Sequence, residues 1–264
     1  MSDVKLDLHN KPWSARLLHI EQPVMFVVQI LTASKNCFNG EGVWSFIDVR
    51  GLTVVDFGVG ESTYRLIDLG ADVIVVDIDA EKLRRHVDLG ADLIRCDITD
   101  LPFDRRVADL AVFYFTLHEI DPVKHREIVS TARRIASKIL VVEPSPEGCR
   151  AYRRYAELWR EAMHSIGRFE EYKPASYWTG LVEGCGFKIT VLKKIKQNKA
   201  LSPSELKEIV DHAIKEWVKL SVEDKYIDGM RSFLSYAKKN GMKWSDLTVI
   251  IGEGGLHKHF NYRF

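Results

Sequence analysis

The sequence predicts an α/β fold: a doubly wound and mostly parallel sheet, with an antiparallel late strand and a helical insertion before that strand. Two observations lead to this prediction. From Leu52 onward, short apolar runs alternate with helical stretches, and most of the runs end in an acidic residue, a pattern typical of βαβ units. Farther along, two apolar runs enclose a long periodic helical segment. We expect strands at residues 52–56, 73–77, 93–97, 108–115, 139–143, 188–192 and 247–251.

Length and composition are those of an ordinary globular protein. The chain has 264 residues, enough to bury a full core, and 46% of them are hydrophobic. No apolar run reaches the roughly 18 residues of a membrane span, and charged residues interrupt the N-terminus where an export signal would be apolar. We therefore expect a cytoplasmic protein that does not associate with membranes. The net charge of +1 produces no overall attraction to nucleic acid, and the four cysteines are too widely spaced for a zinc knuckle or a disulfide framework.

Residues 1–50 precede the alternating pattern. They include Trp13, Leu17, Leu18 and the apolar run 24–31, which are able to form helical faces. We expect an N-terminal helical extension at 1–50 and a single domain at 51–264.

A near-repeat organises the first strands. Residues 68–74 recur almost unchanged as residues 88–94, and each copy leads to an aspartate, Asp77 or Asp97. In each copy a glycine closes a helix in the left-handed conformation and an apolar strand follows. Because parallel strands end at the same edge of a sheet, where open α/β folds bind ligands, we expect both carboxylates at a binding edge. Asp79 precedes a helical segment and is expected to cap it.

The second half of the chain is mainly helical. A helix is expected at 149–166, after a proline-rich turn. Ser202 followed by Pro203 is typical of a helix start, and periodic apolar residues continue beyond it. This segment, at about 203–242, is interpreted as a helical insertion that joins two neighbouring strands.

A glycine-rich loop, residues 56–60, follows the first strand and precedes a helix that begins near Glu61. Its glycines permit a tight turn and the close approach of a ligand. A dinucleotide-binding loop would have a third glycine near position 63, where this chain has Thr63, and the acidic Glu61 would repel a phosphate. The loop therefore favours a zwitterionic or cationic cofactor whose ammonium group pairs with Asp56.

Several motifs taken together resemble one family. Besides the glycine-rich loop and Asp77, the chain has Asp97 followed by Ile98, a Leu-Pro-Phe sequence at 101–103, and a fourth strand that leads to a Leu-His pair. These features resemble the class I S-adenosylmethionine-dependent methyltransferases, in particular the small-molecule, type 11-like members that include quinone methyltransferases. The resemblance covers roughly residues 51–192. It implies a Rossmann-like sheet and S-adenosylmethionine as cofactor, although Ser62 stands where the family has a third glycine.

The resemblance also implies which residues hold the cofactor. The glycine-rich loop would contact the methionine portion, Asp77 the ribose hydroxyls and Asp97 the adenine amino group. The cofactor-binding residues expected on this basis are Asp56, Gly58, Gly60, Asp77, Ile78, Asp97, Ile98 and Phe115.

Candidate acceptor-side residues follow the fourth strand. His118 and Glu119 lie where the family places residues near the substrate, and His118 is a candidate general base because the ordinary histidine pKa of about 6.5 suits proton removal at neutral pH. The pair is equally consistent with a helix start, and methyl transfer often needs only alignment of acceptor and sulfonium. Aromatic residues after the fifth strand are lid candidates, although their helical spacing is more typical of core residues. They are Tyr152, Tyr155, Trp159, His164, Tyr172, Tyr177 and Trp178.

The expected function is transfer of a methyl group to an oxygen, nitrogen or carbon atom of a small-molecule acceptor. The lysines between Lys188 and Lys199, with the helical insertion, leave RNA or protein methylation as an alternative, although these lysines also suit a protected strand edge and the base-methylating motifs are missing. A non-catalytic binding subunit is a third interpretation. We predict no metal site, because His257 and His259 would need further ligands, and the oligomeric state stays open.

Overall fold

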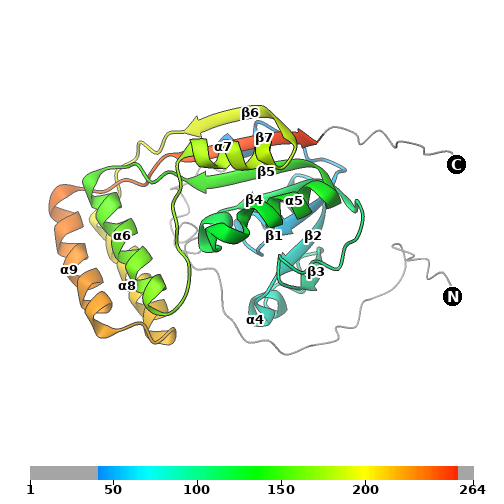
Figure 1. Ribbon diagram of the computed structural model, residues 1–264. Coiled ribbons are helices and arrows are strands. Elements are labelled where there is room, and N and C mark those ends of the chain that lie inside the picture. The colour runs from blue at the N-terminus through cyan, green and yellow to red at the C-terminus, as the bar shows by residue number, and fades with distance from the viewer. Residues whose placement is uncertain (1–40, 255–264) are drawn as a thin grey trace, which may run out of the picture.

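The computed structural model describes residues 41–254 of the chain (Figure 1). The predictions for residues 1–40 and for His257 and His259 lie outside the described residues. Among the helices of residues 41–254, none combines the length and apolar character that crossing a membrane requires.

A seven-stranded sheet in the order β3-β2-β1-β4-β5-β7-β6 forms the centre of the structure (Figure 1). Neighbouring strands are parallel except where β7 takes part, since β7 runs antiparallel to both β5 and β6. The predicted fold class, with its late antiparallel strand, is confirmed. The strands are β1 (Thr53–Phe57), β2 (Asp72–Asp77), β3 (Asp92–Arg95), β4 (Ala108–Tyr114), β5 (Ala136–Pro144), β6 (Phe187–Ile195) and β7 (Leu247–Gly254).

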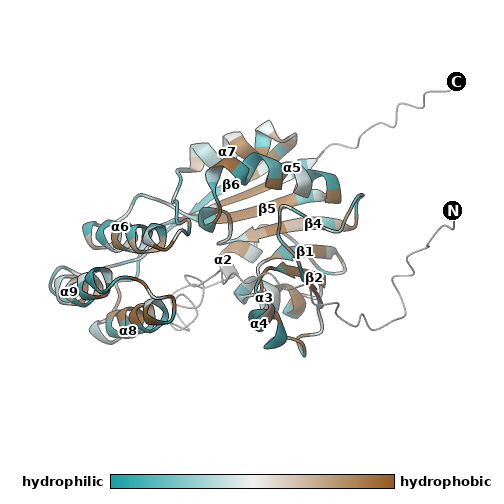
Figure 2. Ribbon diagram, turned by 60° about the horizontal axis from the view of Figure 1, so that its bottom comes forward, coloured by the Kyte–Doolittle hydropathy of each residue, from teal (hydrophilic) through white to brown (hydrophobic). Residues whose placement is uncertain are grey.

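Helices cover both faces of the sheet. Figure 2 shows α5 (His125–Ile135) and α7 (Ala175–Gly184) on one face, and α2 (Glu41–Trp44), α3 (Glu61–Asp68) and α4 (Ala80–Arg84) on the other. The alternation of side chains along β4 divides the core accordingly. Leu110 and Val112 pack in one buried cluster, whereas Ala111 and Phe113 pack in the other. The central strands are buried on both faces, which explains why they are nearly continuous apolar runs.

The predicted helical insertion consists of α8 (Pro203–Lys219) and α9 (Asp224–Asn240), between β6 and β7. Ser202 caps α8: its hydroxyl accepts a hydrogen bond from the Glu205 backbone N–H, and the Glu205 carboxylate accepts one from the Ser202 N–H. Both helices lie beside α6 (Arg150–Ser165), apart from the layers that cover the sheet (Figures 1 and 2). Trp159 of α6 packs against Trp217 of α8, with ring centroids 5.2 Å apart.

Both glycines of the near-repeat form left-handed turns as predicted, but only Gly70 closes a helix, because α4 already ends at Arg84, well before Gly90. Gly70 and Gly90 have left-handed backbones, with φ of 84° and 75°. Asp79 caps α4, because its carboxylate accepts hydrogen bonds from the backbone N–H groups of Glu81 and Lys82. These local features place β2 and β3 in the same direction, side by side.

The strand order reverses between β1 and β4. From β1 the chain continues to β2 and β3 on one side, then returns to β4 on the other side of β1. The parallel strands β1, β2 and β4 therefore end at the same edge of the sheet. Ligands bind at such a reversal point in doubly wound folds, because the chains leaving the strands diverge there and leave a crevice.

Candidate functional site

A cavity of about 450 Å³ lies at the reversal point. Its volume is within the usual range of small-molecule sites. One side consists of residues at and just after the strand ends, including Gly58, Asp77, Asp97 and Thr116; the other side comes from the end of α6 and the following segment, including Trp159, Met163, Phe169 and Glu170.

Asp97 lies at one end of this cavity with Ile78 and Ile98. Its Oδ1 accepts hydrogen bonds from the backbone N–H and the hydroxyl of Thr99, at 2.8 and 2.7 Å. Burial alone would raise the pKa of Asp97, but the Thr99 bonds and the positive charge of Lys124 outweigh it and lower that pKa. The carboxylate is therefore charged at neutral pH and suited to accept hydrogen bonds from a ligand beside apolar side chains.

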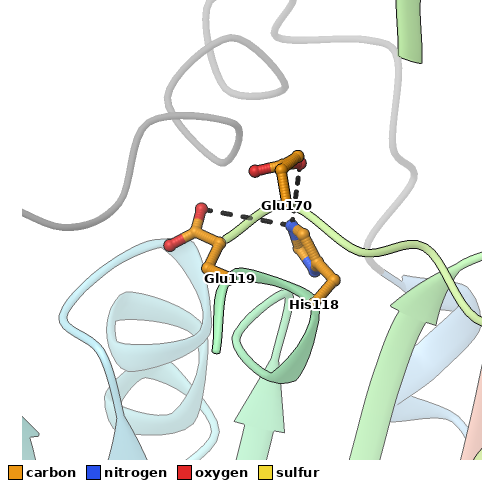
Figure 3. Close-up of side chains that lie close together, drawn as sticks. All are labelled: His118, Glu119 and Glu170. Carbon is orange, nitrogen blue, oxygen red and sulfur yellow. Dashed lines mark ion pairs between the residues drawn. The ribbon is translucent and has the colours of Figure 1, made fainter. Parts of the chain in front are cut away.

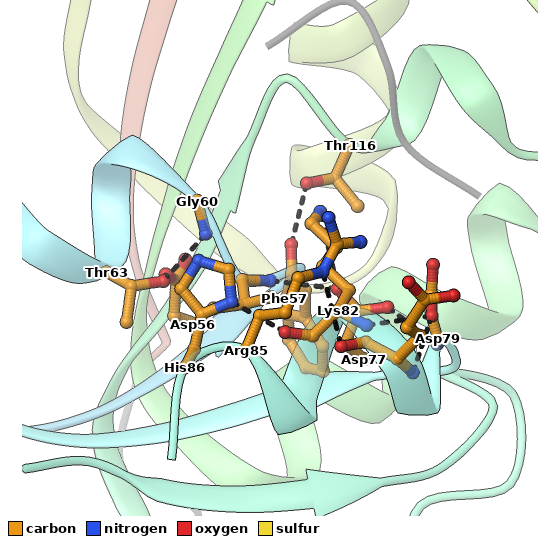
Figure 4. A network of polar contacts seen from close by, with 12 residues as sticks. Asp56, Phe57, Gly60, Thr63, Asp77, Asp79, Lys82, Arg85, His86 and Thr116 are labelled. Atoms are coloured by element: carbon orange, nitrogen blue, oxygen red, sulfur yellow. Dashed lines mark hydrogen bonds and ion pairs between the residues drawn. The ribbon is translucent and has the colours of Figure 1, made fainter. Parts of the chain in front are cut away.

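Asp77 connects the glycine-rich loop to β2 (Figure 4). Its carboxylate accepts hydrogen bonds from the Val59 N–H at 3.0 Å and the Asp79 N–H at 2.9 Å, and Lys82 Nζ lies 3.5 Å away. Gly58, at the turn of the loop, has a φ of 95°, a conformation that favours glycine. Asp77 both lines the cavity and holds the loop in place.

A buried polar cluster borders the cavity on the acceptor side (Figure 3). His118 Nδ1 lies 2.5 Å from a Glu143 carboxylate oxygen, while His118 Nε2 lies 3.6 Å from Glu170 Oε1 and 4.0 Å from Glu119 Oε1. Glu119 and Glu170 line the cavity. His118 and Glu143 are fully buried behind them.

The charges of this cluster change the expected behaviour of His118. Burial lowers the pKa of His118, but the adjacent carboxylates of Glu143 and Glu170 dominate and raise it to about 10. Burial likewise raises the pKa of Glu170 to about 8. His118 is thus protonated at neutral pH in this arrangement. A protonated imidazole has no lone pair with which to accept a proton, so the geometry does not favour His118 as a general base.

Comparison with known proteins finds a family similarity over part of the chain. Residues 55–156 match a family model described as a methyltransferase domain. This part of the chain is therefore similar to a methyltransferase domain. No curated protein matches the sequence.

Solved structures share the fold of this chain. A proposed methyltransferase of Bacillus halodurans C-125 has a TM-score of 0.58 at 15% identity, over 81% of this chain and 98% of that chain. A methyltransferase of Mesorhizobium loti that depends on S-adenosylmethionine has a TM-score of 0.52 at 16% identity, over 80% and 95%. A mycolic acid cyclopropane synthase, crystallised with SAH and CTAB, has a TM-score of 0.54 at 12% identity, over 81% and 82%. Identities this low show the fold alone.

Asp56 is not among the residues that line the cavity. Its buried carboxylate accepts hydrogen bonds from the hydroxyls of Ser62, at 2.9 Å, and Thr63, at 2.7 Å (Figure 4). Burial raises the pKa of Asp56 to about 7. Ser62 and Thr63, which depart from the glycine patterns considered above, thus attach the first turn of α3 to β1. The pairing of Asp56 with a cofactor ammonium stays a prediction.

Phe115 is buried at the end of β4 and is also absent from the cavity lining. It has a left-handed backbone with φ of 55°, a strained conformation for a non-glycine residue. The next residue, Thr116, does line the cavity, and its hydroxyl donates to the Phe57 carbonyl at 2.8 Å. The backbone N–H groups of Thr116 and Leu117 donate to Glu143 Oε1 at 3.1 and 2.7 Å. Residues after β4 are therefore held to both β1 and β5.

Sequence reasoning assigned no site role to Glu143, Glu170 or Thr116. In the sequence, Glu143 is only the acidic residue that ends an expected strand, and no local pattern singles out Glu170. Among the aromatic lid candidates, Trp159 lines the cavity. The other lid candidates do not line the cavity. Of these, Tyr152, Tyr155 and Trp178 are buried in the core, which is the role that their helical spacing favours.

Proposed function

We propose that the protein transfers the methyl group of S-adenosylmethionine to an oxygen, nitrogen or carbon atom of a small-molecule acceptor. The observation that carries this proposal is the cavity at the strand ends of the methyltransferase domain, with Asp77 and Asp97 beside an apolar lining. When bound, the cofactor supplies an electrophilic methyl group on a sulfonium centre.

The cavity residues fit this cofactor. Asp97 would accept a hydrogen bond from the adenine amino group, between the apolar side chains of Ile78 and Ile98. Asp77 would accept from the ribose hydroxyls, and Gly58 allows the methionine portion to approach the loop. The cyclopropane synthase that shares this fold was crystallised with SAH, which supports a cofactor of this class.

The shape of the acceptor side supports a small molecule. Trp159, Met163 and Phe169 line the cavity opposite the strand ends. The insertion helices α8 and α9 pack on α6 and contribute no residue to the cavity lining. The insertion therefore gives no support to a macromolecular substrate. The lysines of β6 lie on an edge strand of the sheet, where charged residues discourage pairing with other chains.

Binding of S-adenosylhomocysteine to the purified protein, measured by calorimetry, tests the cofactor assignment. We expect one site per chain and an affinity about 10-fold to 100-fold weaker in the Asp97→Asn variant, because a hydrogen bond to a charged group is lost. Asp100→Asn is the matched control, since this exposed carboxylate in the same loop does not line the cavity. Absence of binding to the folded wild-type protein would overturn the proposal.

Transfer of a labelled methyl group into cell extract tests the acceptor class. Label in small metabolites is the expected outcome. Label in tRNA or protein would instead favour a macromolecular acceptor. Cofactor binding without any transfer would favour the non-catalytic interpretation.

A further inference from the structure

Three potential metal ligands converge at the border of the cavity: His118 Nε2 and one carboxylate oxygen each from Glu119 and Glu170 (Figure 3). These atoms all lie within 4.8 Å of one another. His118 is fully buried, and its Nε2 has no hydrogen-bond partner, as is also true of Glu119 Oε2. Buried polar atoms without partners are rare because they lose their interactions with water. His118 Nε2 points toward Oε1 of Glu119 and Oε1 of Glu170, at 4.0 and 3.6 Å.

The histidine is held as metal-ligating histidines are. Glu143 binds Nδ1, and Glu143 is itself fixed by the backbone N–H groups of Thr116 and Leu117. With Nδ1 bonded to Glu143, Nε2 points toward Glu119 and Glu170, and a metal ion bound there would displace the Nε2 proton of the protonated imidazole. Glu170 in turn accepts a hydrogen bond from the Tyr172 hydroxyl. The ligands are therefore oriented by a second set of contacts.

The charge balance also favours a cation. Three carboxylates, those of Glu119, Glu143 and Glu170, surround one imidazole. Lys82 and Arg168 are further cations whose charges attract Glu119. Neither forms an ion pair with Glu119 within the described part of the chain, and Lys82 pairs with Asp77 instead. One imidazolium offsets only part of the charge that three ionised carboxylates would carry, and a bound divalent ion would favour their ionised forms.

We propose that His118, Glu119 and Glu170 bind a divalent transition-metal ion, whose open coordination positions face the cavity. Ligand atoms about 2.1 Å from a metal lie about 3.0 to 3.4 Å apart at octahedral or tetrahedral angles, so the observed separations need only small side-chain shifts. An imidazole with two carboxylates suits ions such as Zn²⁺, Mn²⁺, Fe²⁺ or Co²⁺. The open positions would take an oxygen of the methyl acceptor. This last role rests on the proposed function, whereas metal binding itself does not.

Titration of the chelator-treated full chain with Co²⁺, followed by visible absorption and calorimetry, tests the site. We expect one Co²⁺ per chain and an increase in the melting temperature, because the ion binds the folded state. Glu119→Gln and Glu170→Gln each remove a charged ligand and are expected to weaken binding at least about tenfold. Glu143 would not contact the metal itself but orients His118, so Glu143→Gln is expected to weaken Co²⁺ binding about 10-fold to 100-fold.

Glu171→Gln is the matched control, because Glu171 is the adjacent carboxylate but pairs with Lys173 and His164 instead. Its Co²⁺ affinity should equal that of the wild type. Glu119 reaches the cavity, so its variant leaves the core packing unchanged and keeps the test valid if the Glu143 variant does not fold.

Failure of the wild type to bind Co²⁺, or equal binding by all the variants, would overturn the metal proposal. Cofactor binding separates the two proposals: a protein that binds S-adenosylhomocysteine but not Co²⁺ contradicts the metal site alone. A protein that binds Co²⁺ but not S-adenosylhomocysteine contradicts the proposed function alone.

Discussion

Acidic residues at the ends of neighbouring strands have different roles because they have different partners. The Asp56 carboxylate is buried and bonded by two hydroxyls, whereas Asp77 is bonded by backbone N–H groups of the adjacent loop. Asp97 borders the cavity and keeps its charge. Glu143 fixes a histidine from behind. Residue type and position at a strand end are thus insufficient to define a role; the hydrogen-bond donors nearby decide it.

Replacement of Asp56 by asparagine should change how stability depends on pH. The folded-state pKa of Asp56 is about 7 against an ordinary 3.8, so the folded protein binds an additional proton between these values. The stabilisation that comes from this raised pKa is fully present below the ordinary pKa of 3.8 and is lost as pH rises through about 7. Between about pH 5 and about pH 8, the wild type should lose about 2–3 kcal/mol relative to Asp56→Asn. Urea denaturation of both proteins at the two pH values measures this difference.

Asp97→Asn is a suitable control for that measurement. The pKa of Asp97 is lowered, so its contribution changes only when pH falls below the ordinary aspartate range. The stability difference between this variant and the wild type should therefore be constant over the same interval. If Asp56→Asn also shows a constant difference, its carboxyl group is charged throughout and the inferred pKa is wrong.

At the level of elements, α6 is the link between the cavity and the helical insertion. Trp159 lines the cavity and also packs against Trp217 of α8, while Tyr155 packs against Phe233 of α9 with ring centroids 5.6 Å apart. The insertion therefore supports the acceptor side from behind. The apolar faces of α8 and α9 pack within the buried core, so they do not favour a role of the insertion as a binding surface for a partner protein.

Trp217→Ala tests this support. Trp217 is fully buried, so its removal should reduce the free energy of unfolding by about 3–5 kcal/mol through lost contacts and a cavity. The adjacent Val218 is 59% exposed, and Val218→Ala should change stability by less than about 0.5 kcal/mol. Equal effects of the two substitutions, measured by chemical denaturation, would contradict the packing described here.

Across the whole molecule, one buried cluster joins the sheet to the insertion. It includes Val54 and Leu110 of the central strands, Tyr155 of α6, Trp217 of α8 and Phe233 of α9. A second cluster lies on the opposite face of the sheet, beneath α5 and α7. Because the larger cluster spans both parts, the insertion has no core separate from that of the sheet.

Unfolding should consequently be cooperative. We expect a single transition in urea, with coincident curves from far-ultraviolet circular dichroism and tryptophan fluorescence, since Trp159 and Trp217 report on α6 and α8. This outcome would support one domain at 51–264. Two separated transitions would instead show that the insertion folds independently.

Local patterns determined the parts of this protein that depend on neighbouring residues. The seven strands, the left-handed Gly70 and Gly90, and the caps at Asp79 and Ser202 follow from side-chain periodicity and short-range backbone sterics. The sequence also predicts that Asp77 and Asp97 lie at the same edge of the sheet, because the pattern indicates that both strands are parallel.

Only the tertiary structure decided which acidic groups meet His118. Glu143 is 25 positions away and Glu170 is farther still, and strand order with the return of the chain after α6 brings them together. Burial of that cluster then determines its charge, which no local sequence pattern specifies.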